Sequence, residues 1–105
     1  MPTKFRVSLS RAAERDFDDV WEFISQDDRE AAVRFVLQLE ERVSTLETFP
    51  ERCPLLPEND LLSTQHRHLI YGDYRIIFRI KGRVVYVVRV LHSARLLDAT
   101  ALENQ

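Results

Sequence analysis

The basic and imidazole side chains of this sequence are concentrated in one apolar stretch. Between Gln65 and Arg95 they recur at short intervals: Arg67, Arg75, Arg79, Arg89, Arg95, His66, His68 and His92. Guanidinium groups hold phosphate or carboxylate charge, and imidazoles exchange protons near neutral pH. Because a buried charge is costly unless it is paired, we expect these groups to have a partner or a use. The stretch is therefore the candidate functional face.

Two other kinds of site are not favoured. His66 and His68 alternate about Arg67, but no carboxylates accompany them at the spacing of metal ligands. Cys53 is the only cysteine, so the chain has no internal disulfide and no thiolate cluster. Its position between two loop residues offers no helix N-terminus that would activate a thiolate. We expect no metal and no cofactor.

The segments that carry the basic residues are predicted to form a meander of antiparallel strands. Three runs rich in Ile, Val, Tyr and Phe extend over about Gln65–Tyr71, Tyr74–Ile80 and Arg83–His92, separated by glycine-containing turns. The middle run alternates, so one face should meet the core and the other should carry Arg75 and Arg79. The last run is apolar on both faces, which is typical of a central strand.

The first half of the chain predicts a strand and two helices. Thr3–Ser8 alternates like a half-buried strand, and Ser10 is a plausible N-cap for a helix to about Ser25. Its acidic residues should face out or sideways: Asp16, Asp18, Asp19 and Glu22. Asp27 and Glu30 resemble a capping box for a second helix that ends near Glu47. The two helices should form an αα-hairpin.

These elements predict an α+β fold in a single domain of residues 1–105. The N-terminal strand and the three-stranded meander would form a small antiparallel sheet, covered on one face by the αα-hairpin. A loop with three prolines, residues 49–64, joins the two halves, and its leucines should pack at the core edge: Leu55, Leu56, Leu61 and Leu62. The segment after Arg95 is expected to form a short helical turn or to fray.

The charge distribution limits the range of possible functions. Residues 1–60 hold 8 Lys/Arg and 14 Asp/Glu, whereas residues 61–105 hold 7 and 3. Of the 15 basic residues 13 are Arg, which favours fixed recognition of acidic groups. A pI near 5.9 argues against general nucleic-acid binding, so we expect no sequence-specific DNA binding. No signal peptide or membrane span is evident, and the cytoplasm is the expected location.

Taken together, the element order and three motifs resemble a known family. LETFPERCPLLPE, YRIIFRI and VVYVVRVLHSAR occur in the order expected of the ParE branch of the RelE/ParE toxin superfamily, and the resemblance covers about Phe5–Leu97. It implies a growth-inhibiting toxin of a bacterial type II toxin–antitoxin module. A cognate antitoxin would neutralise it by wrapping it with a disordered C-terminal segment. ParE-like members poison DNA gyrase, and RelE-like members cleave mRNA in the ribosomal A site.

The RNA-cleaving alternative needs a base, cations for the phosphorane and a proton donor. Arg67, Arg75 and His92 could take these roles, with Glu58 as base if the proline-bearing loop folds over the sheet. This set is incomplete, because a lysine-rich face is lacking and no Tyr follows His92. The acidic hairpin would also repel rRNA.

The ParE-like interpretation is therefore preferred, as a non-enzymatic gyrase poison. Its target-binding candidates are Arg75, Arg89, His92 and Arg95, the last two forming the H-x-x-R pattern of that branch. An apolar hairpin groove and a sheet edge would hold the antitoxin. The antitoxin-binding candidates are Phe17, Trp21, Val36 and Arg79.

Three weaker interpretations stay open. The chain could be an inactive homologue that only binds antitoxin. Arg75 and Arg79 could pair with Asp73, Glu58 or a helix carboxylate and lock the sheet. His92 could be a structural histidine.

Overall fold

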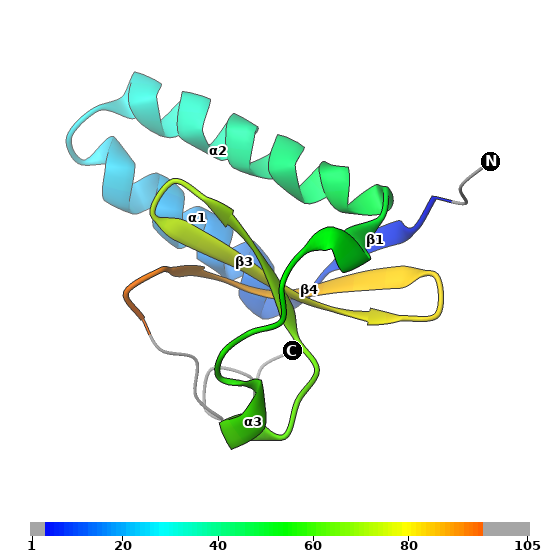
Figure 1. Cartoon of the computed structure of the whole chain (residues 1–105). Coiled ribbons are helices and arrows are strands. Elements are labelled where there is room, and N and C mark those ends of the chain that lie inside the picture. Colours follow the sequence, from blue (N-terminus) through cyan, green and yellow to red (C-terminus); the bar gives the residue numbers. More distant parts are fainter. Residues whose placement is uncertain (1–3, 96–105) are drawn as a thin grey trace.

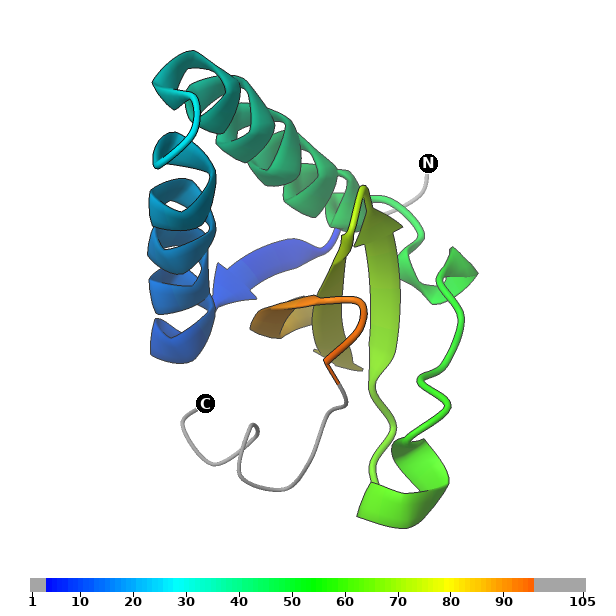
Figure 2. The ribbon, with the colours of Figure 1, turned by 90° about the vertical axis from the view of Figure 1, so that its left-hand side faces the viewer.

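A four-stranded sheet carries two helices on one face and an irregular loop on the other (Figures 1 and 2). The computed structural model describes residues 4–95. The strands are β1 (Arg6–Leu9), β2 (Arg67–Tyr71), β3 (Tyr74–Lys81) and β4 (Val84–His92), and the helices are α1 (Arg11–Ser25), α2 (Arg29–Ser44) and the short α3 (Asn59–Leu62). The α+β class and the helical hairpin are confirmed. The segment after Arg95, for which a short turn was expected, lies outside the described residues.

The sheet is mixed rather than wholly antiparallel. Its strand order is β1-β4-β3-β2, and β1 pairs with β4 in parallel, with Val7 opposite Val85. The prediction of an all-antiparallel sheet is therefore wrong at this strand. Alternating apolar residues identify a strand but not its direction, and the long connection between β1 and β4 permits a parallel pair. The other two pairings are antiparallel, as expected.

Both long helices begin at capped positions. The Ser10 hydroxyl accepts a hydrogen bond from Ala13 N at 3.0 Å, which confirms the predicted start of α1. The cap of α2 is Asp28, which accepts from Ala31 N at 3.1 Å. The capping box on Asp27 is wrong, because the N–H of Asp27 still donates to Ile24 O at the end of α1. α2 ends at Ser44, and a 3-10 turn over Thr45–Glu47 completes the predicted helical segment.

The helix face of the sheet holds the main core. Ile76 and Phe78 of β3 are fully buried there, with partly buried Tyr74 and Ile80 beside them, so the predicted alternation is confirmed. β4 buries residues on both faces, as predicted for a central strand. Its helix-face residues are Val85, Val87 and Val90, and its opposite-face residues are Val88 and Leu91. A register shift between Ile77 and Phe78 lets β4 change phase.

The proline loop, residues 49–64, covers part of the other face, which we call the loop face. Leu56 is buried there and Leu62 packs against the same small cluster. Leu55 is 50% exposed and Leu61 is 88% exposed, so the expectation that all four leucines pack at the core edge is wrong for these two. The loop also forms an isolated antiparallel bridge between Leu55 and Arg67, the first residue of β2. This bridge covers the beginning of the free edge of β2. In the described part of the chain, no helix is long and apolar enough to cross a membrane.

Candidate functional site

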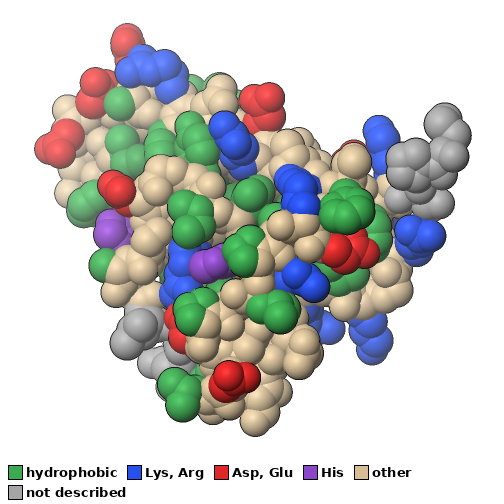
Figure 3. All heavy atoms as spheres, in the orientation of Figure 1, with side chains coloured by type: hydrophobic (Ala, Val, Ile, Leu, Met, Phe, Trp, Pro, Cys, Tyr) green, Lys and Arg blue, Asp and Glu red, His purple; other side chains and the backbone are tan. Residues whose placement is uncertain are grey.

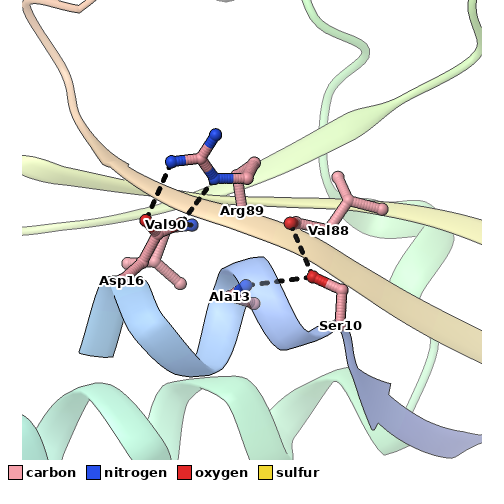
Figure 4. Close-up of polar contacts among 6 residues, drawn as sticks. All are labelled: Ser10, Ala13, Asp16, Val88, Arg89 and Val90. Atoms are coloured by element: carbon pink, nitrogen blue, oxygen red, sulfur yellow. Dashed lines mark hydrogen bonds and ion pairs between the residues drawn. The ribbon is translucent and has the colours of Figure 1, made fainter. Parts of the chain in front are cut away.

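The outer edge of β4 is completed by side chains of α1 (Figure 4). β1 ends at Leu9, so the last residues of β4, which pair with β3 on one side, have no neighbouring strand on the other side. The Ser10 hydroxyl donates to Val88 O at 2.8 Å, and Val90 N donates to the Asp16 carboxylate at 2.8 Å. Two helix side chains thus replace the missing strand, which fixes the end of β4 against α1.

Asp16 also holds Arg89 through two hydrogen bonds. Arg89 Nε and Nη2 donate to the two carboxylate oxygens at 2.8 and 2.9 Å. Asp16 is buried and Arg89 is partly buried, so this fork is shielded from water. The geometry makes Arg89 a residue that positions β4 at α1.

A second buried ion pair crosses the loop face. Arg75 Nη1 and Nη2 donate to the two oxygens of Glu58 at 3.1 and 3.0 Å, and both residues are buried. Arg75 Nη2 also donates to Arg95 O at 2.7 Å. Of the pairings left open by the sequence, the structure forms the one with Glu58. Arg75 therefore joins the proline loop, β3 and the chain segment after β4.

His92 and Arg95 lie exposed at the end of β4. The His92 ring meets Tyr74 edge-on at 5.6 Å between centroids, and Ala94 N donates to His92 Nδ1 at 3.1 Å. Since Nδ1 accepts this bond, the ring proton of neutral His92 lies on Nε2. Both residues border a hollow of about 170 Å³, together with Tyr74 and Asp19.

The proline loop holds Arg67 and lies against His66. Arg67 Nη1 donates to Cys53 O at 2.6 Å and to Glu51 O at 3.2 Å. His66 is buried, and neither ring nitrogen finds a hydrogen-bond partner among the described residues. Burial lowers the pKa of His66, and the positive charge of Arg79 lowers it further. Among residues 4–95, no cluster of His, Cys, Asp or Glu side chains could hold a metal ion.

The antitoxin-binding candidates divide between two places. Phe17, Trp21 and Val36 are half-buried residues of the helical hairpin. Phe17 lines a hollow of about 360 Å³ together with Leu9, Glu14, Glu40 and Val43. Arg79 lies on the sheet instead, with its guanidinium 4.7 Å from the centroid of the Tyr86 ring. Figure 3 shows several acidic side chains at the far end of the hairpin, with basic ones among them, and further basic side chains over the rest of this face.

One family model matches most of the chain. Residues 7–97 match the family described as the ParE toxin of the type II toxin-antitoxin system, parDE. The chain belongs to the ParE toxin family. A solved structure of the chromosomal ParDE toxin–antitoxin system from P. aeruginosa is similar in fold, with a TM-score of 0.67 and 18% sequence identity over 86% of this chain and 97% of that one. A search of curated protein sequences gave no match.

In this ParE-family chain the sequence reasoning missed Asp16, which was expected on a solvated face. A signal was present, because Ala13, Asp16 and Val20 are three and four residues apart and therefore share one helical stripe. All three are buried. A carboxylate placed on an apolar stripe indicates a buried partner, but not which arginine that partner is.

Proposed function

We propose that this ParE-family chain stops growth by acting on DNA gyrase through the surface at the end of β4, and that a cognate antitoxin neutralises it. The proposed contact surface consists of the exposed side chains of His92 and Arg95. Arg75 and Arg89, which the sequence predicts as target-binding residues, hold in place the backbone that carries this surface. One holds the carbonyl of Arg95 and the other fixes β4 to α1.

The observation that carries the proposal is the buried Glu58–Arg75 pair. In an RNA-cleaving site Glu58 would be the base and Arg75 the cation that meets the phosphorane. Here the two groups neutralise each other in a closed fork, in which the Arg75 side chain is 6% exposed and the Glu58 side chain is 10% exposed. Arg67 is similarly engaged with two loop carbonyls. Three of the four candidates for RNA cleavage, Glu58, Arg67 and Arg75, are thus used to hold the proline loop, which favours a binding surface over a nuclease.

The helical hairpin and β1 support the antitoxin part of the proposal. β1 lies at the edge of the sheet, and its residue Leu9 also lines the hollow beside Phe17. An extended segment can add to a sheet edge, and an apolar segment can occupy a helical groove. At β1 the two modes of capture would lie side by side. We therefore place the antitoxin along β1 and the hairpin, with Trp21 and Val36 in contact with it.

The target is tested by incubating the purified chain in parallel with gyrase and supercoiled plasmid, and with programmed ribosomes. We expect trapped, cleaved plasmid and no mRNA cuts. Codon-phased mRNA cuts would overturn the gyrase assignment. Inertness in both assays, together with tight antitoxin binding, would instead identify a binding module.

The contact surface is tested by growth of cells that express variants without antitoxin. His92→Ala and Arg95→Ala should relieve growth arrest while the far-ultraviolet circular dichroism stays native. Arg29→Ala is a matched control, because Arg29 is an exposed arginine at the start of α2 and is not part of the proposed contact surface. Unchanged toxicity of both β4-end variants would remove these residues from the site.

A further inference from the structure

We use the name seam for two sets of residues in the helical hairpin: Glu14, Phe17 and Trp21 of α1, and Val36, Glu40 and Val43 of α2. Within each helix these residues are three and four apart, so each set forms one stripe. The two helices run side by side in opposite directions (Figure 1). The helices diverge from their short connection (Figure 2), and residues of both line a hollow between the start of α1 and the end of α2.

The seam combines an apolar floor with two acidic residues. Phe17, Val43 and Leu9 supply apolar surface to the hollow of about 360 Å³, and Glu14 and Glu40 line the same hollow from opposite helices. Both glutamates are exposed, and neither forms an ion pair within residues 4–95. Among the residues that the structure describes, no basic side chain lines the hollow. Its charge is therefore left for a partner to complement.

We propose that the antitoxin segment lying on the seam is apolar and basic: an apolar side chain fills the hollow, and Lys or Arg side chains pair with Glu14 and Glu40. This inference rests on the proposed function, since it assumes that antitoxin covers the hairpin. A segment with acidic flanks would bring like charges together beside an apolar floor, where repulsion is less screened than in open water. The same carboxylates would attract a basic segment during the encounter and fix its register.

The proposed chemistry also separates two parts of the toxin surface. The exposed residues at the end of β4 include Arg95, which suits an acidic partner, whereas the seam suits a basic one. A single antitoxin that covered both would need opposite charges in different segments. Charge would then help to determine which segment lies on which surface.

The test uses the full chain and two synthetic helical peptides with the same leucines at positions i, i+4 and i+7. One peptide carries Arg beside the leucines, and the other carries Glu at the same positions. Fluorescence anisotropy should show that the Arg peptide binds about tenfold more tightly, with an affinity that falls as salt is added. Equal affinities, preference for the Glu peptide, or no binding of either would overturn the proposal.

The variant pair Glu14→Gln/Glu40→Gln should weaken binding of the Arg peptide about fivefold and reduce its salt dependence. Glu22→Gln/Glu41→Gln is the matched control, because it removes the same charge from exposed positions of the same two helices but away from the seam. It should change the affinity less than about twofold. An equal effect of the two double variants would mean that net charge alone attracts the peptide, which overturns the site.

A last comparison separates this inference from the proposed function. If the cognate antitoxin neither binds the chain nor rescues growth, the proposed function fails. If it does both, and Glu14→Gln/Glu40→Gln leaves the affinity of that complex unchanged, only the charge assignment of the seam fails. Sedimentation of the chain alone tests the other occupant: a dimer that Phe17→Ala dissociates would place a second copy on the seam and overturn the proposal.

Discussion

The two faces of the sheet are covered in different ways. On the helix face, the hairpin buries Ile76, Phe78 and Leu39 completely in one apolar core. On the loop face, a smaller apolar cluster around Ile77 lies beside the buried Glu58–Arg75 pair. Apolar burial tolerates many side-chain combinations, whereas a buried ion pair depends on both partners.

The loop face is further held by one amide side chain. Asn59 Nδ2 donates to His66 O at 2.8 Å, and Asn59 Oδ1 accepts from His66 N at 3.1 Å. The proline loop thus has few apolar contacts and several directed polar ones. Regions of this kind open at a lower free energy than apolar cores, so we expect the loop face to be locally less stable. The following changes test this difference between the faces.

The largest effect is expected on the helix face. Phe78→Ala removes a fully buried ring from the main core and should lower the free energy of unfolding by about 4 kcal/mol. Urea denaturation measures this directly. Leu56→Ala on the loop face should cost less, because it removes a smaller side chain from the smaller cluster. An equal or larger cost for Leu56 would contradict the difference between the two faces.

Arg75→Ala should have the next largest effect and lower the free energy of unfolding by about 3 kcal/mol, because it leaves the Glu58 carboxylate buried without its main partner. The double replacement Arg75→Met/Glu58→Leu removes both charges and should restore most of that stability. Urea denaturation of the two variants gives the comparison. A double variant as unstable as Arg75→Ala would show that the ion pair itself stabilises the loop. Because Arg75 also holds Arg95 O, both variants are expected to weaken toxicity.

A smaller loss of stability is expected when the pH is lowered. Burial lowers the pKa of His66 and His68 below the usual 6.5; Arg79 adds to the lowering at His66 and Arg75 at His68, while Glu58 opposes it at His68. A histidine with a lower pKa when folded binds fewer protons than in the unfolded chain. The free energy of unfolding should therefore fall as the pH drops below 6.5, until the folded-state pKa is passed.

This pH effect is measured by urea denaturation between about pH 8 and about pH 5.5, a range in which exposed carboxylates stay largely ionised. His66→Gln/His68→Gln should flatten the pH profile. His92→Gln is the control, because it removes an exposed imidazole at the end of β4 and leaves both loop-face histidines in place. A profile that the double variant does not flatten would remove the loop-face histidines as its cause.

The smallest effect concerns backbone conformation. Ser63 ends α3 with a φ of 53°, in the left-handed region that favours glycine. Ser63→Gly should raise the free energy of unfolding by about 0.5 kcal/mol, because relief of strain slightly exceeds the added entropy of the unfolded chain.

Gly72 provides the contrast on the helix face. It has a φ of +57°, and a Cβ there would lie 3.3 Å from the Phe35 ring of α2. Gly72→Ala should therefore lower the free energy of unfolding by about 1 kcal/mol or more. Thermal unfolding of the two variants gives the signs, and the same sign for both would contradict this account.

Local sequence patterns were enough to predict the two long helices, the strands and the main core. The helix stripes, the Ser10 cap, the alternation of β3 and the double burial along β4 are all set by neighbours a few residues apart, which periodicity detects. The same local motifs supported the resemblance to the ParE branch, which the family match confirmed.

The partners of the buried charged side chains depend on the tertiary structure. Glu58 and Arg75 are 17 residues apart, and Asp16 and Arg89 are 73 apart, so no local pattern assigns either pair. The parallel direction of β1 and the exposure of Leu55 and Leu61 were settled in the same way, by which segments meet in space. Apolar side chains need only a buried face, which periodicity predicts, whereas a charged side chain needs one particular partner, which only the folded chain supplies.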